Sequence, residues 1–174
     1  EELWRWFSVP PSGGDPEWDF KDADKGNIKA YPGDWGDTDL IGGGAVWSML
    51  AIDQAERTIY FTTGSSSGVF DAALRPGPNL YASSIIALNV DSGEMKWYYQ
   101  VVPHDINDHE VGWSVILAET EINGDMKKVI MAGSKTDHVF VLDAETGKTL
   151  HTPLMLGNNA FNVPNDDAGN NADL

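Results

Sequence analysis

The stretch IIALNVDSGEMKWYY (residues 85–99) decides the fold, because VFVLDAETGKTLHT (residues 139–152) follows the same plan. Each begins with an apolar run, passes through polar and acidic residues to Ser/Thr-Gly, and ends in a polar–apolar run. Gly93 and Gly147 occupy the position of a tight β-hairpin turn that favours a positive φ. EELWRW (residues 1–6) matches the outgoing half of this hairpin, and AIDQAERTIYF (residues 51–61) is a looser hairpin of the same kind. The repeat predicts antiparallel units that bury their faces against one another.

The rest of the chain also favours an all-β fold. Short runs rich in β-branched and aromatic residues predict strands at residues 47–52, 58–63, 83–90, 95–102, 113–119, 129–133 and 138–142. No stretch places apolar residues at helical spacing. A β-sandwich stays open as an alternative, but the repeated hairpin plan favours β-propeller blades.

Two segments depart from the strand rhythm. Residues 8–39 are rich in Pro, Gly and Asp, and we expect either a packed excursion loop or a mobile linker. Residues 158–174 are polar, and we expect an irregular C-terminal segment. The whole of residues 1–174 is expected to be one partial propeller domain.

Composition restricts the partners. The 174 residues carry 27 acidic and 11 basic side chains, a net charge of −16, which argues against nucleic acid and anionic membrane surfaces as partners. This balance is compatible with divalent cations, a cationic partner protein or a salty environment. The chain has no cysteine, and we find no apolar run near the ~20 residues of a membrane span.

The segment VVPHDINDHEVGW (residues 101–113) concentrates ionisable side chains between two strand-like runs. It holds His104, Asp105, Asp108, His109 and Glu110. From the residues alone, it is either a catalytic loop with metal-binding carboxylates or an acidic turn, the ordinary place for Asp. A zinc site from His104 and His109 has no diagnostic spacing.

Several motifs, in order, give the chain a family resemblance. GGGAVW (residues 42–47), AID, YFTTGS (60–65), RPGPNLY (75–81), DSGEMKWYYQ, PHDINDHE and AGSKTDHVFVLD resemble the quinoprotein alcohol dehydrogenases. The resemblance covers residues 1 to about 150. It implies an eight-bladed β-propeller that holds pyrroloquinoline quinone (PQQ) and a metal ion in a central funnel, with this chain an internal portion of about three blades.

The resemblance assigns three residues to the cofactor and its chemistry. Trp47 matches the tryptophan that forms the floor under the PQQ ring, and the glycines before it, Gly44 among them, let the backbone approach closely. Asp108 matches the catalytic aspartate, the general base that takes the alcohol proton while hydride passes to PQQ. Lys135 matches the basic residue that bridges this aspartate and the cofactor oxygens.

The expected metal ligands are Asp108, Ser65 and Glu110. Glu110 lies two residues after Asp108, where lanthanide-using members carry an extra aspartate, so Ca²⁺ and a lanthanide both stay open. Ser65 replaces the family's usual asparagine, and Asn107 replaces the usual tryptophan before the catalytic aspartate. His104 and Asp105 are expected to hold the loop by hydrogen bonds to the backbone.

The predicted function is therefore PQQ-dependent oxidation of an alcohol to the aldehyde. The resemblance implies a small alcohol as substrate, a cytochrome c or copper protein as electron acceptor, and a periplasmic or otherwise extracytoplasmic location. The alternative is a non-catalytic propeller of the same repeat type that acts as a scaffold or binding module. Trp47, Asp108 and Lys135 favour the enzyme, whereas Ser65 and Asn107 favour the scaffold. As part of a funnel, the isolated chain is expected to be inactive.

Overall fold

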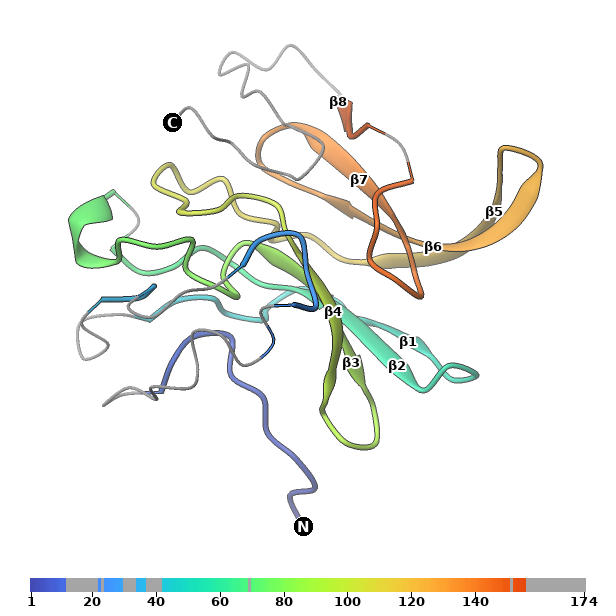
Figure 1. The fold of residues 1–174 in the computed structure, drawn as a ribbon, viewed down its shortest axis with the longest axis horizontal. Helices are drawn as coiled ribbons and strands as arrows, with labels where there is room; N and C mark the ends of the chain where they lie inside the picture. Colours follow the sequence, from blue (N-terminus) through green and yellow to red (C-terminus); the bar gives the residue numbers. More distant parts are fainter. Residues whose placement is uncertain are drawn as a thin grey trace.

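The computed structural model describes residues 1–11, 22, 24–29, 34–36, 42–68, 70–150 and 152–155. In these residues the strands form two antiparallel four-stranded sheets, with a 3-10 turn at Ala72–Leu74 (Figure 1). The first sheet contains β1 (Ala51–Asp53), β2 (Thr58–Thr62), β3 (Ser84–Asn89) and β4 (Met95–Gln100), in chain order. The second contains β5 (Ile116–Ile122), β6 (Asp125–Gly133), β7 (His138–Asp143) and β8 (Leu154–Met155). This confirms the all-β prediction.

The two hairpins of the sequence repeat form as predicted, between β3 and β4 and directly after β7. Gly93 has φ +71° and donates its N–H to the Asn89 carbonyl at 2.9 Å. Gly147 has φ +70° and donates in the same way to the Asp143 carbonyl at 2.8 Å. The side chains of Asn89 and Asp143 also accept hydrogen bonds from the N–H groups of their own turns. Each turn is therefore determined by residues within it.

A tryptophan packs on each of these turn glycines. A methyl group on Gly147 would lie 2.6 Å from the Trp97 ring, and one on Gly93 would lie 2.6 Å from the Trp4 ring. Trp97 donates its indole N–H to the Ala144 carbonyl at 3.0 Å, and Trp4 donates to the Val90 carbonyl at 2.8 Å. The turn of each repeat is thus covered by a tryptophan from the preceding repeat. About three blades were predicted, and the structure shows two four-stranded sheets. Residues 1–7, which include the outgoing half of a further repeat, keep the tryptophan–glycine contact through Trp4 but form no strand.

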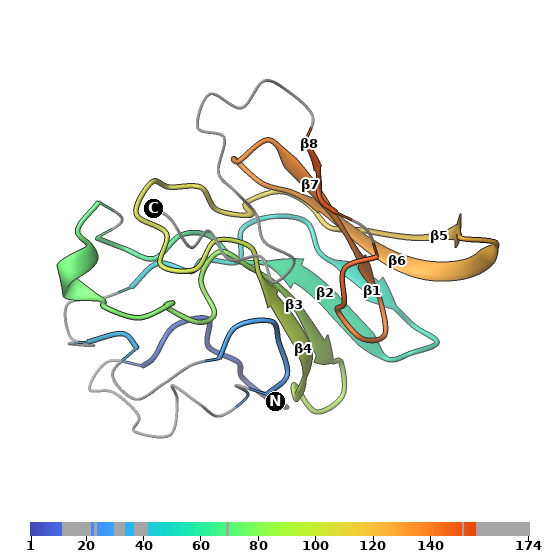
Figure 2. The ribbon, with the colours of Figure 1, turned by 45° about the horizontal axis from the view of Figure 1, so that its top comes forward.

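The first sheet is buried on both faces. Between the sheets lies one apolar cluster that includes Ile85, Trp97, Val111, Ile130 and Phe140. The other face of the first sheet packs in a second cluster, to which Trp35 contributes from the long segment after the first residues. Figure 2 shows the two sheets side by side, as expected of neighbouring blades.

The described parts of residues 8–39 pack against the first sheet. Trp35 is buried and donates its indole N–H to the Leu80 carbonyl at 2.7 Å. Asn27 exchanges two hydrogen bonds with the backbone of Gln100, at 2.9 and 2.8 Å. These parts therefore behave as a packed excursion. The division of the chain into these segments stays a prediction, and residues 158–174 lie outside the described residues.

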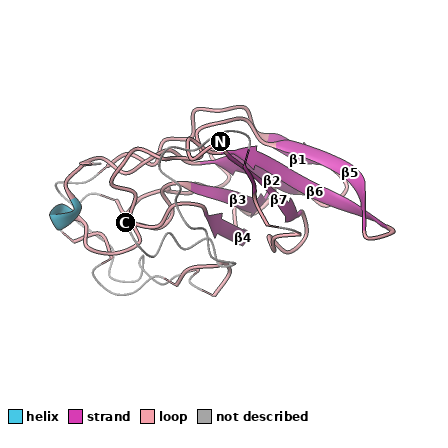
Figure 3. Cartoon of the chain, turned by 90° about the horizontal axis from the view of Figure 1, so that it is seen from above, coloured by secondary structure: helices cyan, strands magenta, loops and turns pink. Residues whose placement is uncertain are grey.

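Some strand boundaries were wrong. Residues 47–50 and 113–115 are not strands, because Trp47, Met49 and Trp113 belong to exposed connections. β6 begins at Asp125, four residues before the predicted start, because it pairs with β5 along the whole protruding hairpin. The long connections after β2 and β4 lie at one end of the molecule, away from the strands (Figures 1 and 3).

Candidate functional site

The site is assembled from four loop segments that are far apart in the sequence. Residues 42–45 run beside residues 64–67: Gly44 donates its N–H to the Ser65 carbonyl at 2.8 Å, and Gly64 donates to Ala45 at 3.0 Å. Gly43 has φ +86°, and a methyl group there would lie 2.5 Å from the Ser65 carbonyl oxygen, so only glycine fits. Gly44 is buried against Ser8 and Val9 and supports Ser65 from behind.

Ser65 contacts all three acidic residues of the loop at residues 101–113. Its hydroxyl lies 2.8 Å from Asp105 Oδ2 and 3.1 Å from Asp108 Oδ1. Its backbone N–H donates to Glu110 Oε2 at 2.8 Å. The predicted ligands Ser65, Asp108 and Glu110 are therefore neighbours in space.

Lys135 completes the cluster from the connection between β6 and β7. Its ammonium lies 2.8 Å from Asp108 Oδ2 and 2.8 Å from Glu110 Oε1. Its backbone N–H donates to the Glu110 carbonyl at 3.2 Å. Lys135 thus bridges the two carboxylates, and its predicted role between Asp108 and the cofactor oxygens stays a prediction.

The electrostatics keep Asp108 ionised. Its side chain is 47% exposed, whereas that of Glu110 is 12% exposed. The hydrogen bond from Lys135, followed by that from Ser65, lowers the pKa of Asp108 despite partial burial. Burial alone would lower the pKa of Lys135, but the hydrogen bonds to Asp108 and Glu110 outweigh it and raise that pKa. Both groups are charged at neutral pH.

Trp47 presents a flat apolar surface next to this cluster. Its ring lies against the backbone of Gly112 and Gly64, where added methyl groups would come within 2.3 and 3.2 Å of it. The same methyl position on Gly64 lies 3.3 Å from Glu110 Oε2, so the ring and the carboxylate are adjacent. Trp47 is 60% exposed. It therefore has the free surface that a planar ligand needs.

Behind the cluster lies a buried residue that the sequence analysis missed. Arg75 is fully buried and donates to the Asp105 carbonyl and to Asn79 Oδ1, both at 2.6 Å, and to the Ser67 carbonyl at 3.2 Å. It joins the segment of Ser65 to the loop of Asp108. The motif RPGPNLY served only to support the resemblance, although a lone arginine among turn residues was a signal for such a bridge.

His104 and Asp105 hold the loop, as predicted. His104 Nδ1 lies 2.8 Å from the Gly77 carbonyl, and Asp105 Oδ1 accepts the N–H groups of Asn107 and His109 at 3.0 and 3.1 Å. Within the described part of the chain, no group of three or more His, Asp or Glu side chains is placed to hold a metal ion.

The cluster nevertheless fits a hard cation in its chemistry. All its donors are oxygens, three carboxylates and one hydroxyl lie together, and one ammonium offsets only part of their charge. The set is incomplete, since Asp108, Glu110 and Ser65 supply fewer ligands than Ca²⁺ or a lanthanide requires. Further ligands would have to come from the cofactor or from outside the described residues.

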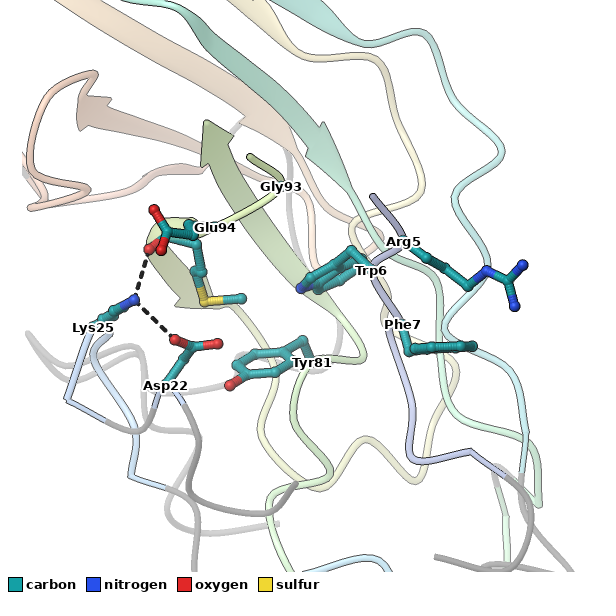
Figure 4. Close-up of a pocket in the computed structure, with 9 residues that line it drawn as sticks. Arg5, Trp6, Phe7, Asp22, Lys25, Tyr81, Gly93 and Glu94 are labelled. Atoms are coloured by element: carbon teal, nitrogen blue, oxygen red, sulfur yellow. Dashed lines mark hydrogen bonds and ion pairs between the residues drawn. The ribbon is translucent and has the colours of Figure 1, made fainter. Parts of the chain in front are cut away.

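A separate pocket, of about 250 Å³, lies beside the β3–β4 hairpin (Figure 4). Trp6, Phe7 and Tyr81 line it together with Asp22 and Lys25, among other residues. Lys25 is already held by Asp22 at 2.9 Å and by the Met95 carbonyl at 2.9 Å. The pocket holds none of the predicted site residues.

Comparison with known proteins decides the family. A family model for the β-propeller domain of glucose/ethanol/alcohol dehydrogenases, named PQQ, matches residues 10–156. The chain belongs to this family. This family match confirms both the resemblance to the quinoprotein alcohol dehydrogenases and the predicted β-propeller.

Individual relatives agree with this assignment. The quinohemoprotein alcohol dehydrogenase of Comamonas testosteroni is 39% identical over 154 residues, which cover 85% of this chain and 21% of that protein. Quinohemoprotein alcohol dehydrogenase ADH IIB of Pseudomonas putida is 36% identical over 152 residues, which cover 84% of this chain and 21% of that protein. The chain thus spans about a fifth of the length of these curated relatives.

Solved structures share the fold. The crystal structure of the Comamonas testosteroni quinohemoprotein alcohol dehydrogenase matches with a TM-score of 0.72 and 35% identity, over 88% of this chain and 23% of that chain. A europium-containing methanol dehydrogenase matches with a TM-score of 0.74 and 24% identity, over 95% of this chain and 30% of that chain. Among the described residues, no helix is both long and apolar enough for a membrane crossing.

Proposed function

We propose that this chain carries part of the active site of a PQQ-dependent dehydrogenase that oxidises a small alcohol to the aldehyde. The observation that carries the proposal is the cluster at the loop end of the two sheets. There, Asp108 is held by Lys135 at 2.8 Å, and Glu110 of the same cluster adjoins the exposed ring of Trp47. A scaffold has no need for an ionised, half-exposed carboxylate in the same cluster as a second carboxylate that adjoins a flat apolar surface. Membership of the family supports the same conclusion.

Asp108 is proposed as the general base. Its pKa is lowered, chiefly by Lys135, so the side chain is an ionised carboxylate at neutral pH, the form that a general base must have before it takes the proton of the alcohol hydroxyl. Its 47% exposure leaves room for the substrate to reach it. PQQ, when bound, would supply the two-electron acceptor for the hydride from the alcohol carbon. Trp47 would hold the cofactor's plane, Gly44 would keep the supporting backbone close, and Lys135 would offset negative charge near it.

A cation is proposed at Ser65, Asp108 and Glu110. Ser65 contacts both carboxylates, Asp108 through its hydroxyl at 3.1 Å and Glu110 through its backbone N–H at 2.8 Å, and Ca²⁺ or a lanthanide prefers such oxygen donors. The cation would keep Asp108 ionised and polarise the cofactor's carbonyl. The additional negative charge of Glu110 favours the more highly charged ion.

A soluble redox protein is the proposed electron acceptor. One relative, from Pseudomonas sp, is named lupanine 17-hydroxylase [cytochrome c], which supports a cytochrome c for this protein also. A copper protein is the other candidate. We propose the periplasm or an equivalent extracytoplasmic compartment as the location of the parent protein, which the family membership and such a partner support.

The test is a PQQ titration of the full-length protein with Ca²⁺ or La³⁺, followed by dye-coupled alcohol oxidation. Asp108→Asn should bind PQQ but lose about 10²–10⁴-fold in kcat, since it cannot take the proton. The control Asp91→Asn changes an exposed aspartate that pairs with Arg57 and should leave kcat unchanged. If PQQ binds with neither cation, the non-catalytic scaffold replaces the dehydrogenase.

A further inference from the structure

Asp105 is the most buried carboxylate of the cluster, with 3% of its surface exposed. A carboxylate in such a place needs hydrogen bonds to offset its lost hydration. Oδ1 accepts the N–H groups of Asn107 and His109 at 3.0 and 3.1 Å. Oδ2 faces two hydroxyls, Ser65 Oγ at 2.8 Å and Ser83 Oγ at 3.2 Å.

The Ser65 hydroxyl stands between two carboxylates but has a single hydrogen. It lies 2.8 Å from Asp105 Oδ2 and 3.1 Å from Asp108 Oδ1, and it can donate to only one of them at a time. Whichever carboxylate does not receive the hydrogen faces a lone pair of Ser65. Two oxygens that face each other in this way are stabilised by a cation between them.

Burial decides which carboxylate receives the hydrogen once a cation binds. Asp108 is 47% exposed and also holds Lys135, so water and the ammonium can satisfy it. Asp105 is buried, and losing one of its two hydroxyl donors would leave Oδ2 under-satisfied. The Ser65 hydroxyl also lies closer to Asp105 than to Asp108, which agrees with Asp105 as the acceptor of its hydrogen.

We propose that Asp105 is a positioning residue that takes the Ser65 hydrogen, so that Ser65 Oγ and Asp108 Oδ1 turn lone pairs toward a shared cation. This rests on the proposed function, which places a cation at Ser65 and Asp108. The arrangement lets a serine act as a ligand, because a hydroxyl is an effective donor to a metal only when its hydrogen is directed elsewhere.

The same carboxylate also fixes the backbone on both sides of Asp108. Asn107 and His109 donate their N–H groups to Asp105 Oδ1, and Asp108 between them has φ +60°, a left-handed conformation that is unusual for a residue other than glycine. Asp105 therefore orients both oxygens that would meet the cation.

The decisive variant is Asp105→Asn, which keeps the shape and one acceptor but turns Oδ2 into an N–H₂ donor. Ser65 must then accept from the amide and point its hydrogen at Asp108. The measurement is the Kd of Ca²⁺ and of La³⁺ by calorimetry in the full-length protein with saturating PQQ. We expect Asp105→Asn and Ser65→Ala each to weaken both cations about 10–100-fold.

A double variant and a control separate the effect of the direction of the Ser65 hydrogen from a general disturbance of the loop. Adding Asp105→Asn to Ser65→Ala should weaken binding less than Asp105→Asn weakens it in the unchanged protein, because no hydroxyl remains to be turned and only the loss of the carboxylate's charge is left. Ser83→Ala removes the other hydroxyl that donates to Asp105 Oδ2. Since Ser83 forms no hydrogen bond with Asp108, this variant should leave the Kd of each cation within about twofold of that of the unchanged protein. Equal, additive losses for Asp105→Asn with and without Ser65 would overturn the proposal.

Ser65→Asn keeps the proposal testable if Asp105→Asn does not fold. Its amide offers an N–H donor for Asp105 and an oxygen for the cation, so it should bind more tightly than Ser65→Ala. If it binds as weakly as Ser65→Ala, the proposal is wrong while the dehydrogenase stands. If the unchanged protein binds neither cation, this proposal and the metal part of the proposed function fail together.

Discussion

Removal of Lys135 should strengthen cation binding while it slows turnover. Lys135 lies 2.8 Å from an oxygen of Asp108 and 2.8 Å from an oxygen of Glu110, two of the three proposed ligands. A bound cation would lie about 2.4 Å from the same oxygens, so ammonium and cation would be at most about 5 Å apart. The two positive charges compete for the same carboxylates, and Lys135→Met removes the competitor.

The magnitude follows from Coulomb's law. In water, a single positive charge about 5 Å from a divalent ion costs about 1.7 kcal/mol, and from a trivalent ion about 2.5 kcal/mol. Lys135 is 38% exposed and can swing toward solvent, which reduces both values. We expect Kd for Ca²⁺ to fall about 5- to 10-fold and Kd for La³⁺ about 10- to 30-fold.

The assay is calorimetry of Ca²⁺ and La³⁺ binding to the full-length, PQQ-free protein, paired with dye-coupled turnover of the loaded enzyme. Turnover of Lys135→Met should fall about 10²–10³-fold, because the ammonium no longer offsets charge at the cofactor. The matched control is Lys128→Met, a lysine on β6 whose partners, Asp53 and Glu56, lie outside the site. Its cation affinities should be unchanged. Unchanged or weaker cation binding in Lys135→Met would refute the reasoning.

Two further predictions concern the support of the site and of the sheets. Gly112→Ala should displace the Trp47 ring, since the added methyl group would lie 2.3 Å from that ring, and PQQ binding should weaken about tenfold or more. The control Gly42→Ala, whose methyl group would lie 3.5 Å from its nearest atom, should leave PQQ binding unchanged. Fluorescence titration with PQQ measures both, and equal affinities would contradict the placement of Trp47. Lys128 lowers the pKa of Asp53 by a hydrogen bond, so the pair stabilises the protein above the ordinary Asp pKa of about 3.9, and this stability is lost as pH falls through the lowered value. The melting temperature of the unchanged protein should therefore fall more steeply below about pH 4 than that of Lys128→Met, and parallel curves in scanning calorimetry would contradict it.

The sequence by itself determined the hairpins and the residue types of the site. Gly93 and Gly147 lie in turns whose hydrogen bonds close within a few residues, so local chemistry was enough to predict them. Motif order was enough to identify the family and to select Trp47, Asp108, Glu110 and Lys135. Strand ends were less predictable: residues 47–50 look like a strand, but they belong to an exposed connection rather than to β1.

Only the tertiary structure decided how the site residues meet. Ser65 and Asp108 are 43 residues apart in the chain, and Arg75 reaches Asp105 across 30. These contacts depend on how the loops of one sheet fold over the end of that sheet, and no local pattern encodes them. The sequence could not show that Lys135 bridges Asp108 and Glu110, or that Asp105 is buried behind Ser65. The physical reason is that burial and the direction of a shared hydrogen are properties of the assembled environment.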